Sequence, residues 1–161
     1  MEAIAPAPAR AYEDQVTLDA ELGYAHAVSE ATPPHGAALG LGASFGLSDL
    51  FSLRGQLTAA QHPGEPSLSV FLVSAELVYL IDVFEFVPYF GLGLDGIGTW
   101  TPDVAFGSDL GAHPVFGIDW LLSRSWAIGL ALRPIFLVTA LADDPVYFRA
   151  GLTLSYLIDP F

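Results

Sequence analysis

Apolar and polar residues alternate with a period of two along most of this chain. In residues 16–24 every second position is apolar, and the positions between them are threonine, acidic or glycine. The same alternation returns in residues 51–59 and 126–133. Because successive side chains of a strand point to opposite faces of a sheet, a period of two predicts β-strands.

The alternation and the turn residues predict eight strands joined by connections that alternate in length. Short connections fall at 48–50, 82–85 and 122–125, and longer ones rich in Pro, Gly, Asp and Ser fall between them. The fold class we predict is all-β, an eight-stranded antiparallel up-and-down transmembrane β-barrel. The predicted strands are 14–28, 37–48, 51–60, 68–81, 86–99, 110–121, 126–138 and 147–157, and the predicted longer loops are 29–36, 61–67, 100–109 and 139–146.

The apolar face of each predicted strand is continuous and rich in aromatics, and the opposite face holds charges and glycines. A soluble barrel needs the reverse arrangement, whereas a closed sheet that is apolar outside and polar inside suits a lipid bilayer. A helix over 126–142 is the alternative, but it would bury Arg133 and Pro134 at mid-bilayer. The alternation favours a strand there.

Aromatic residues gather near the ends of the predicted strands. Amphipathic rings at such positions form girdles at the level of the lipid headgroups. We expect a periplasmic girdle of Phe51, Tyr79, Phe86, Trp120, Trp126 and Tyr156, and an outer girdle of Tyr24, Trp100, Phe136 and Phe148.

Charged residues fall at inward positions of the predicted strands. An eight-stranded barrel is just wide enough for side chains to fill it, and an unpaired buried charge is costly, so these charges must pair. We expect a structural network that occludes the lumen together with Tyr89 and Tyr147. The alternative is a gated ion path or a proton-responsive plug, with His113 or bound cations balancing the acids. The network consists of Asp19, Glu21, Arg54, Glu76, Asp95, Asp119, Arg133 and Arg149.

Two prolines, Pro114 and Pro134, fall inside predicted strands. Their distances from the turn at 122–125 nearly match, so they should face each other across one hairpin. Because proline has no amide hydrogen to donate, that hairpin should be locally unladdered or bulged. This is either a tolerated defect or a lateral opening toward lipid.

The composition narrows the classes of partner. The 161 residues suit one domain, and 53% are hydrophobic. With five Lys and Arg against eighteen acids, the net charge of −13 excludes nucleic-acid binding. No cysteine is present, which suits an oxidising compartment. Acids in the connections could meet divalent cations that bridge anionic lipids; they are Glu30, Glu65, Asp103, Asp109, Asp143 and Asp144.

Candidate catalytic residues are few. His26, Ser29 and Glu30 lie within five residues at the end of the first predicted strand, and His35 and His62 are expected in loops. A histidine with a serine and an acid is the set that acyl chemistry needs, but this spacing is not typical of it. We therefore expect no enzymatic activity, no cofactor and no metal site.

Three segments of the chain resemble the strand motif of the small outer-membrane β-barrel superfamily (OmpW/OmpX-like). They are residues 87–98 (VPYFGLGLDGIG), residues 37–47 and the final RAGLTLSYLIDPF. The resemblance implies a bacterial outer membrane location, and it implies that the terminal aromatic Phe161 is the assembly signal. The partners it implies are outer-membrane lipid and lipopolysaccharide, the barrel assembly machinery and other outer-membrane proteins.

The sequence thus divides into a Pro/Ala-rich periplasmic tether, 1–12, and the barrel, 13–161. Residues 1–12 do not read as a signal peptide, so we expect a leader to be absent from the numbered chain. The expected function is structural or interactive, including docking into a larger outer-membrane assembly. The alternative is a narrow conduit for small apolar or ionic solutes, and a lipid-modifying barrel enzyme is less favoured.

Overall fold

The computed structural model describes residues 12–28, 33–81, 85–102, 104–139 and 146–158. Within these ranges, no helix is long and apolar enough to cross a membrane. The ordered elements are the strands β1 (Val16–Ala27), β2 (His35–Gly46), β3 (Phe51–His62), β4 (Leu68–Leu80), β5 (Phe86–Thr101), β6 (Val104–Leu121), β7 (Trp126–Leu137) and β8 (Val146–Ile158).

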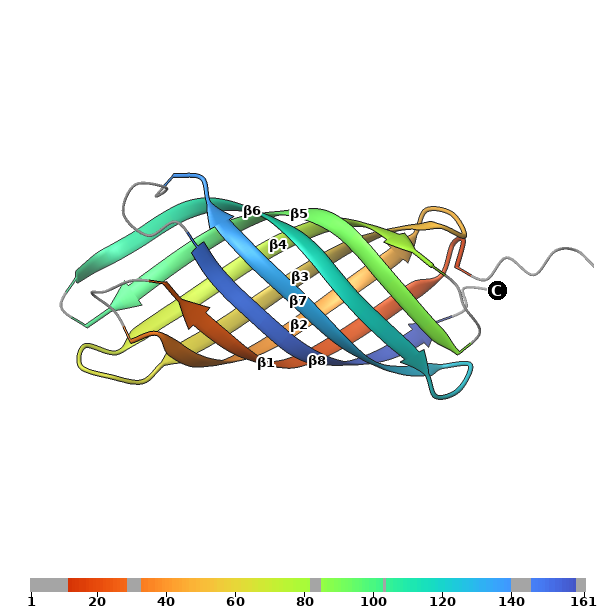
Figure 1. The fold of residues 1–161 in the computed structure, drawn as a ribbon, viewed down its shortest axis with the longest axis horizontal. Coiled ribbons are helices and arrows are strands. Elements are labelled where there is room, and N and C mark those ends of the chain that lie inside the picture. Colours follow the sequence, from red (N-terminus) through yellow and green to blue (C-terminus); the bar gives the residue numbers. More distant parts are fainter. Residues whose placement is uncertain (1–11, 29–32, 82–84, 103, 140–145, 159–161) are drawn as a thin grey trace, which may run out of the picture.

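The strands form one closed barrel in chain order (Figure 1). Each strand pairs antiparallel with the next, and β1 closes the barrel by pairing antiparallel with β8. The connections β2–β3, β4–β5 and β6–β7 lie together with the start of β1 and the end of β8, at what we call the tight-turn end. The opposite end is the loop end. The predicted eight-stranded antiparallel barrel is confirmed.

Side chains alternate between the interior and the outer surface along every strand. In β4 buried and exposed positions follow each other almost without exception. Large apolar residues dominate the outer surface; Leu92 is 71% exposed and Leu41 is 69% exposed. The sequence pattern produces this arrangement directly, because each strand has one apolar and one mixed face.

The interior is filled in three layers along the barrel axis. Near the loop end lies an apolar cluster of alanines with larger side chains, among them Leu72, Ile135 and Tyr147. Near the tight-turn end lies a second apolar cluster, which includes Val78, Val115 and the ring of Tyr89. Buried polar and charged side chains occupy the space between these clusters. The layer between the clusters holds the candidate site.

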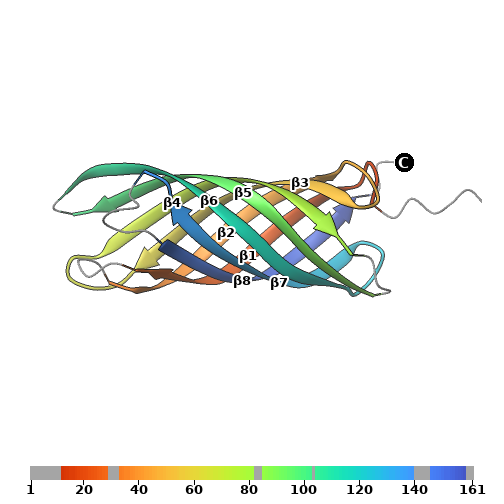
Figure 2. The same cartoon turned by 45° about the horizontal axis from the view of Figure 1, so that its top comes forward.

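The prediction of a long loop over residues 100–109 is wrong. β5 runs to Thr101 and β6 starts at Val104, so the two strands continue as a hairpin that projects at the loop end (Figures 1 and 2). The pairing shifts register between Thr99 and Thr101. Gly, Ser and Asp are typical of turns, but backbone hydrogen bonds hold them here in an extended ladder whatever their propensity.

The pairing of β6 with β7 has a gap at the two prolines. Paired positions run over 111–112 and again over 116–121, with the same register on both sides. Pro114 therefore lies opposite Pro134, and no ladder pair joins residues 113–115 to β7. The predicted interruption is confirmed, since neither proline can donate a ladder hydrogen bond.

Candidate functional site

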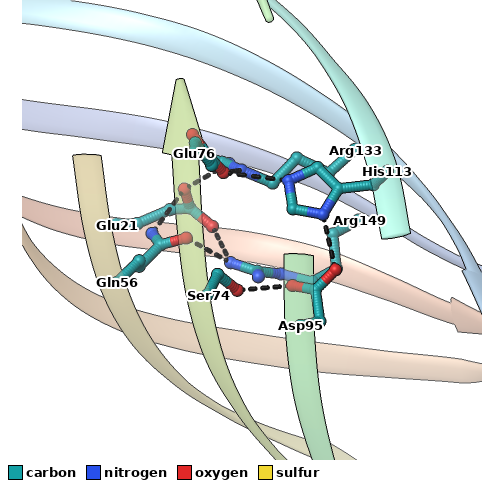
Figure 3. Close-up of polar contacts among 8 residues, drawn as sticks. All are labelled: Glu21, Gln56, Ser74, Glu76, Asp95, His113, Arg133 and Arg149. Carbon is teal, nitrogen blue, oxygen red and sulfur yellow. Dashed lines mark hydrogen bonds and ion pairs between the residues drawn. The ribbon is translucent and has the colours of Figure 1, made fainter. Parts of the chain in front are cut away.

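The middle layer of the barrel interior holds a buried network of charged and polar side chains (Figure 3). Seven strands contribute to it, and the eighth, β2, faces it with Gly40 and Gly42. Side chains from different strands meet because inward positions recur at every second residue of each strand. We call this set the charge network: Glu21, Gln56, Ser74, Glu76, Asp95, His113, Arg133 and Arg149.

Glu21 on β1 joins three of the other strands. Its Oε2 accepts hydrogen bonds from Arg133 Nη1 at 2.8 Å and from Gln56 Nε2 at 2.9 Å. Its Oε1 accepts one from Arg149 Nη2 at 2.7 Å, and Gln56 Oε1 accepts a second bond from the same nitrogen at 3.0 Å. The carboxylate thus links β1 to β3, β7 and β8 through charge-assisted bonds.

Glu76 on β4 carries the network to the other side of the barrel. Its Oε1 accepts from Arg133 Nε at 2.6 Å and lies 3.1 Å from His113 Nε2. The other ring nitrogen, His113 Nδ1, lies 2.5 Å from Asp95 Oδ2, and Ser74 Oγ donates to Asp95 Oδ1 at 2.6 Å. A continuous chain of contacts therefore runs from Arg149 to Ser74 through Glu21, Arg133, Glu76, His113 and Asp95.

His113 completes the charge balance of this chain of contacts. Each of its ring nitrogens faces a carboxylate oxygen, and an ionised carboxylate can only accept a hydrogen bond. This arrangement favours the doubly protonated imidazolium, in which both nitrogens donate. The three carboxylates of the network then meet three cations, two arginines and one histidine, so that the network as a whole is neutral.

Glycines on the neighbouring strands provide the space that these side chains need. A Cβ added at Gly151 would lie 2.5 Å from Glu21 Cδ. A Cβ added at Gly93 would overlap the His113 ring. Contacts this close do not occur between real atoms, so these inward positions cannot carry a side chain while the network keeps its geometry.

A second, smaller set of charges lies toward the tight-turn end. Arg54 Nη2 is 3.3 Å from Asp119 Oδ2, and its guanidinium carbon is 4.1 Å from the centre of the Tyr89 ring. Asp19 accepts a hydrogen bond from Ser155 Oγ at 2.6 Å. A cavity of about 20 Å³ separates these residues from the charge network. Since one water needs about 10 to 15 Å³ measured this way, that cavity is large enough for about one water molecule.

The apolar cluster closes the interior toward the loop end. It packs Leu72, Ile135 and Tyr147 against small inward alanines of β1, β2 and β3. His62 lies at its edge, fully buried, with Nε2 3.0 Å from the Tyr147 hydroxyl. An ion would have to leave water and cross this apolar layer to pass through the barrel, which is unfavourable.

Solved structures share this architecture at low sequence identity. Neither a family model nor a curated protein sequence matches the chain. Neisserial surface protein A (NspA) superposes with a TM-score of 0.67 at 13% identity, covering 89% of this chain and 95% of that one. The outer membrane protein OprG from Pseudomonas aeruginosa gives 0.70 at 11%, covering 91% and 97%. The outer membrane enzyme PagL gives 0.51 at 14%, covering 86% and 97%. The chain has the fold of the small outer-membrane β-barrels.

The sequence-predicted charges all lie inside the barrel, but in two groups. Arg133 and Arg149 bind Glu21, whereas Arg54 binds Asp119 near the tight-turn end. Asp95 contacts His113 and Ser74. The remaining members, Asp19 and Glu76, take the positions described above.

The aromatic residues named from the sequence lie on the outer surface. At the tight-turn end their rings pair across strands: Phe51 with Tyr79, Phe86 with Trp120, and Trp126 with Tyr156, with centroids 5.3, 5.8 and 4.9 Å apart. Toward the loop end Tyr24, Trp100 and Phe136 are exposed and Phe148 is half-buried. Phe161 lies outside the described residues.

The histidines expected in loops lie in strands. His35 begins β2, directly opposite His26, and His62 ends β3 with its ring buried. The loop prediction was wrong because strand pairing continues beyond the last alternating apolar residue. Ser29 and Glu30 lie outside the described residues, as do Asp103, Asp143 and Asp144. Among the described residues, no group of three or more His, Cys, Asp or Glu side chains is arranged to hold a metal ion.

Sequence reasoning missed two members of the charge network, Gln56 and Ser74. Both share the inward parity of Arg54 and Glu76 on their own strands, so the signal was present. Charge alone does not single them out, because both side chains are neutral. A neutral amide or hydroxyl also donates hydrogen bonds to carboxylate oxygens, although it does not balance their charge as an arginine does.

Proposed function

We propose that this chain is a closed, non-conducting β-barrel of the bacterial outer membrane with a structural or interaction role. Its location is supported by the apolar outer surface of all eight strands and by rings paired at the strand ends. Such a continuous apolar surface is stable against lipid but not against water. The outer-membrane proteins that share its fold support the same location.

The filled interior is the observation that carries the proposed role. The charge network spans the lumen with ion pairs of 2.6 to 2.8 Å between arginines and carboxylates. The apolar cluster toward the loop end, which includes Leu72 and Ile135, presents mainly apolar side chains to a solute. Opening a pore would require these ion pairs to break, which would leave buried charges without partners. This cost opposes opening.

The partners that we propose for the protein are those that its outer surface can contact. The apolar band suits lipid and the acyl chains of lipopolysaccharide, and it also suits the apolar face of another outer-membrane protein. Recognition of the terminal Phe161 by the barrel assembly machinery belongs to the same proposal. The proposal includes no cofactor and no catalytic step.

Three measurements test the proposal. The protein refolded in detergent should migrate differently on gels before and after boiling, because a closed barrel resists unfolding by the gel detergent. In planar bilayers it should show no steady conductance, while a general porin in the same bilayers conducts. A reproducible open channel formed by the unmodified protein would overturn the closed-barrel role, and a helical circular-dichroism spectrum would overturn the barrel itself.

A conduit with a lateral exit is the second candidate, favoured by the gap at Pro114 and Pro134. An apolar groove runs along the outer surface beside this gap, and two members of the charge network, Glu76 and His113, border it. A small apolar solute could pass between the groove and the interior there. Uptake of an apolar dye into liposomes, lost when both prolines are replaced by threonine, would support the conduit; equal uptake with empty liposomes would exclude it.

A further inference from the structure

Three side chains with metal-binding atoms meet on the outer surface at the loop end. Tyr24 and His26 are successive outward residues of β1, and His35 is paired with His26 across the β1–β2 ladder. The two imidazole centroids are 5.3 Å apart, and the Tyr24 ring lies 6.3 Å from His26 and 5.9 Å from His35. Strand pairing thus brings His35 of β2 to the two neighbouring residues of β1.

The metal-binding atoms of these three side chains point toward one another. The Tyr24 hydroxyl oxygen lies 2.5 Å from His35 Nδ1 and 3.2 Å from His26 Nδ1. A phenolic hydroxyl has one proton, so it can donate to only one of the two imidazoles. The other imidazole must supply its own proton to the oxygen. Three lone-pair atoms therefore compete for two protons within one small volume.

We propose that Tyr24, His26 and His35 form a site for a divalent transition-metal ion, Cu²⁺ or Zn²⁺. Imidazole nitrogen suits both ions, and Cu²⁺ leads the usual order of affinities. The fourth position would face outward and be filled by water, as in zinc sites with three protein ligands.

One of the two contacts of the Tyr24 oxygen already has the spacing that such an ion needs, and the other is shorter. With metal–ligand bonds of about 2.0 Å, two ligand atoms of a tetrahedral site are about 3.3 Å apart. The oxygen already lies 3.2 Å from His26 Nδ1. The distance to His35 Nδ1 must widen by about 0.8 Å, which a small ring rotation provides because His35 is exposed at the first position of its strand.

The position of the cluster gives a metal ion access from water. His26 is the last residue but one of β1, and Tyr24 is 42% exposed. The other two histidines of the chain, His62 and His113, are fully buried inside the barrel. A metal ion added to the solution therefore reaches His26 and His35 before the two buried histidines. His62 and His113 serve as controls within the same protein.

Titration of the folded protein in detergent with Cu²⁺ and with Zn²⁺ tests the site. We expect one equivalent to bind, with an electron paramagnetic resonance spectrum of Cu²⁺ showing two equivalent nitrogen ligands. His26→Ala and His35→Ala should each lower the affinity more than about tenfold, the scale on which metal sites respond to lost partners. Tyr24→Phe should lower it less. Gln61→Ala, an exposed change at the same rim, should leave it unaltered.

The unmodified protein offers a second measurement that does not depend on variants folding. Zn²⁺ should protect His26 and His35 from carbethoxylation by diethyl pyrocarbonate, mapped by mass spectrometry. Any one of three results would overturn the proposal. Cu²⁺ could be bound through a single nitrogen, both alanine variants could keep the affinity of the unmodified protein, or carbethoxylation could be equal with and without Zn²⁺. Binding would then belong to acidic groups elsewhere on the chain.

Discussion

Replacing Arg133 by alanine tests whether the charge network holds the barrel together. This arginine is 4% exposed and is the one residue that bonds both Glu21 and Glu76 in the described network, at 2.8 and 2.6 Å. Its removal leaves Glu21 with Arg149, and leaves Glu76 with His113. The network then carries one excess negative charge in the buried interior of the barrel, away from bulk water.

The expected loss of stability follows from this burial. Removing one partner of a buried ion pair costs about 3 to 5 kcal/mol, because the remaining charge stays uncompensated. Arg133 serves two carboxylates, so we place the loss at the upper part of this range. Water entering the vacated space would lower it. We do not expect a pore, because the apolar cluster toward the loop end is untouched by the substitution.

Urea unfolding in phospholipid vesicles, followed by tryptophan fluorescence, measures the loss. Arg124→Ala is the matched control, because Arg124 is exposed in the β6–β7 turn and should change the unfolding free energy by less than about 0.5 kcal/mol. The double variant Arg133→Met with Glu21→Gln removes the excess charge and should recover part of the loss. A cost below about 1 kcal/mol for Arg133→Ala, or a steady conductance in that variant, would refute the reasoning.

Two further predictions use matched pairs on β5. Gly93→Ala should destabilise the barrel by about 1 to 3 kcal/mol, because the added methyl overlaps the His113 ring, whereas Gly96→Ala, whose Cβ would meet nothing within 4 Å, should be nearly neutral in the same unfolding assay. Leu94→Arg places a charge on an outer position that is 69% exposed, and it should cost about 2 to 4 kcal/mol in lipid vesicles. Leu94→Ala is its control, and equal stability of the two Leu94 variants would mean that this position does not face lipid.

The sequence alone determined the strands, their number and the face that each residue occupies. These follow from alternation along one strand, which is a local property and needs no knowledge of the partner strand. The inward parity of Arg54, Arg133 and Arg149 could be derived in this way. The opposition of Pro114 to Pro134 followed from their nearly equal distances to the turn at 122–125. The end of β5 and the start of β6 could not, because turn-type residues there are held by pairing that no periodicity reveals.

Only the tertiary structure decided which side chains meet. Arg133 binds Glu21 across 112 positions of sequence, and His113 lies between Glu76 and Asp95, because barrel closure through β1 and β8 sets the height of each inward residue. Parity tells which face a side chain occupies but not its height along the axis, which depends on the stagger accumulated around all eight strands. Alternation along each strand therefore identifies the inward charges, and closure of the barrel assigns their partners.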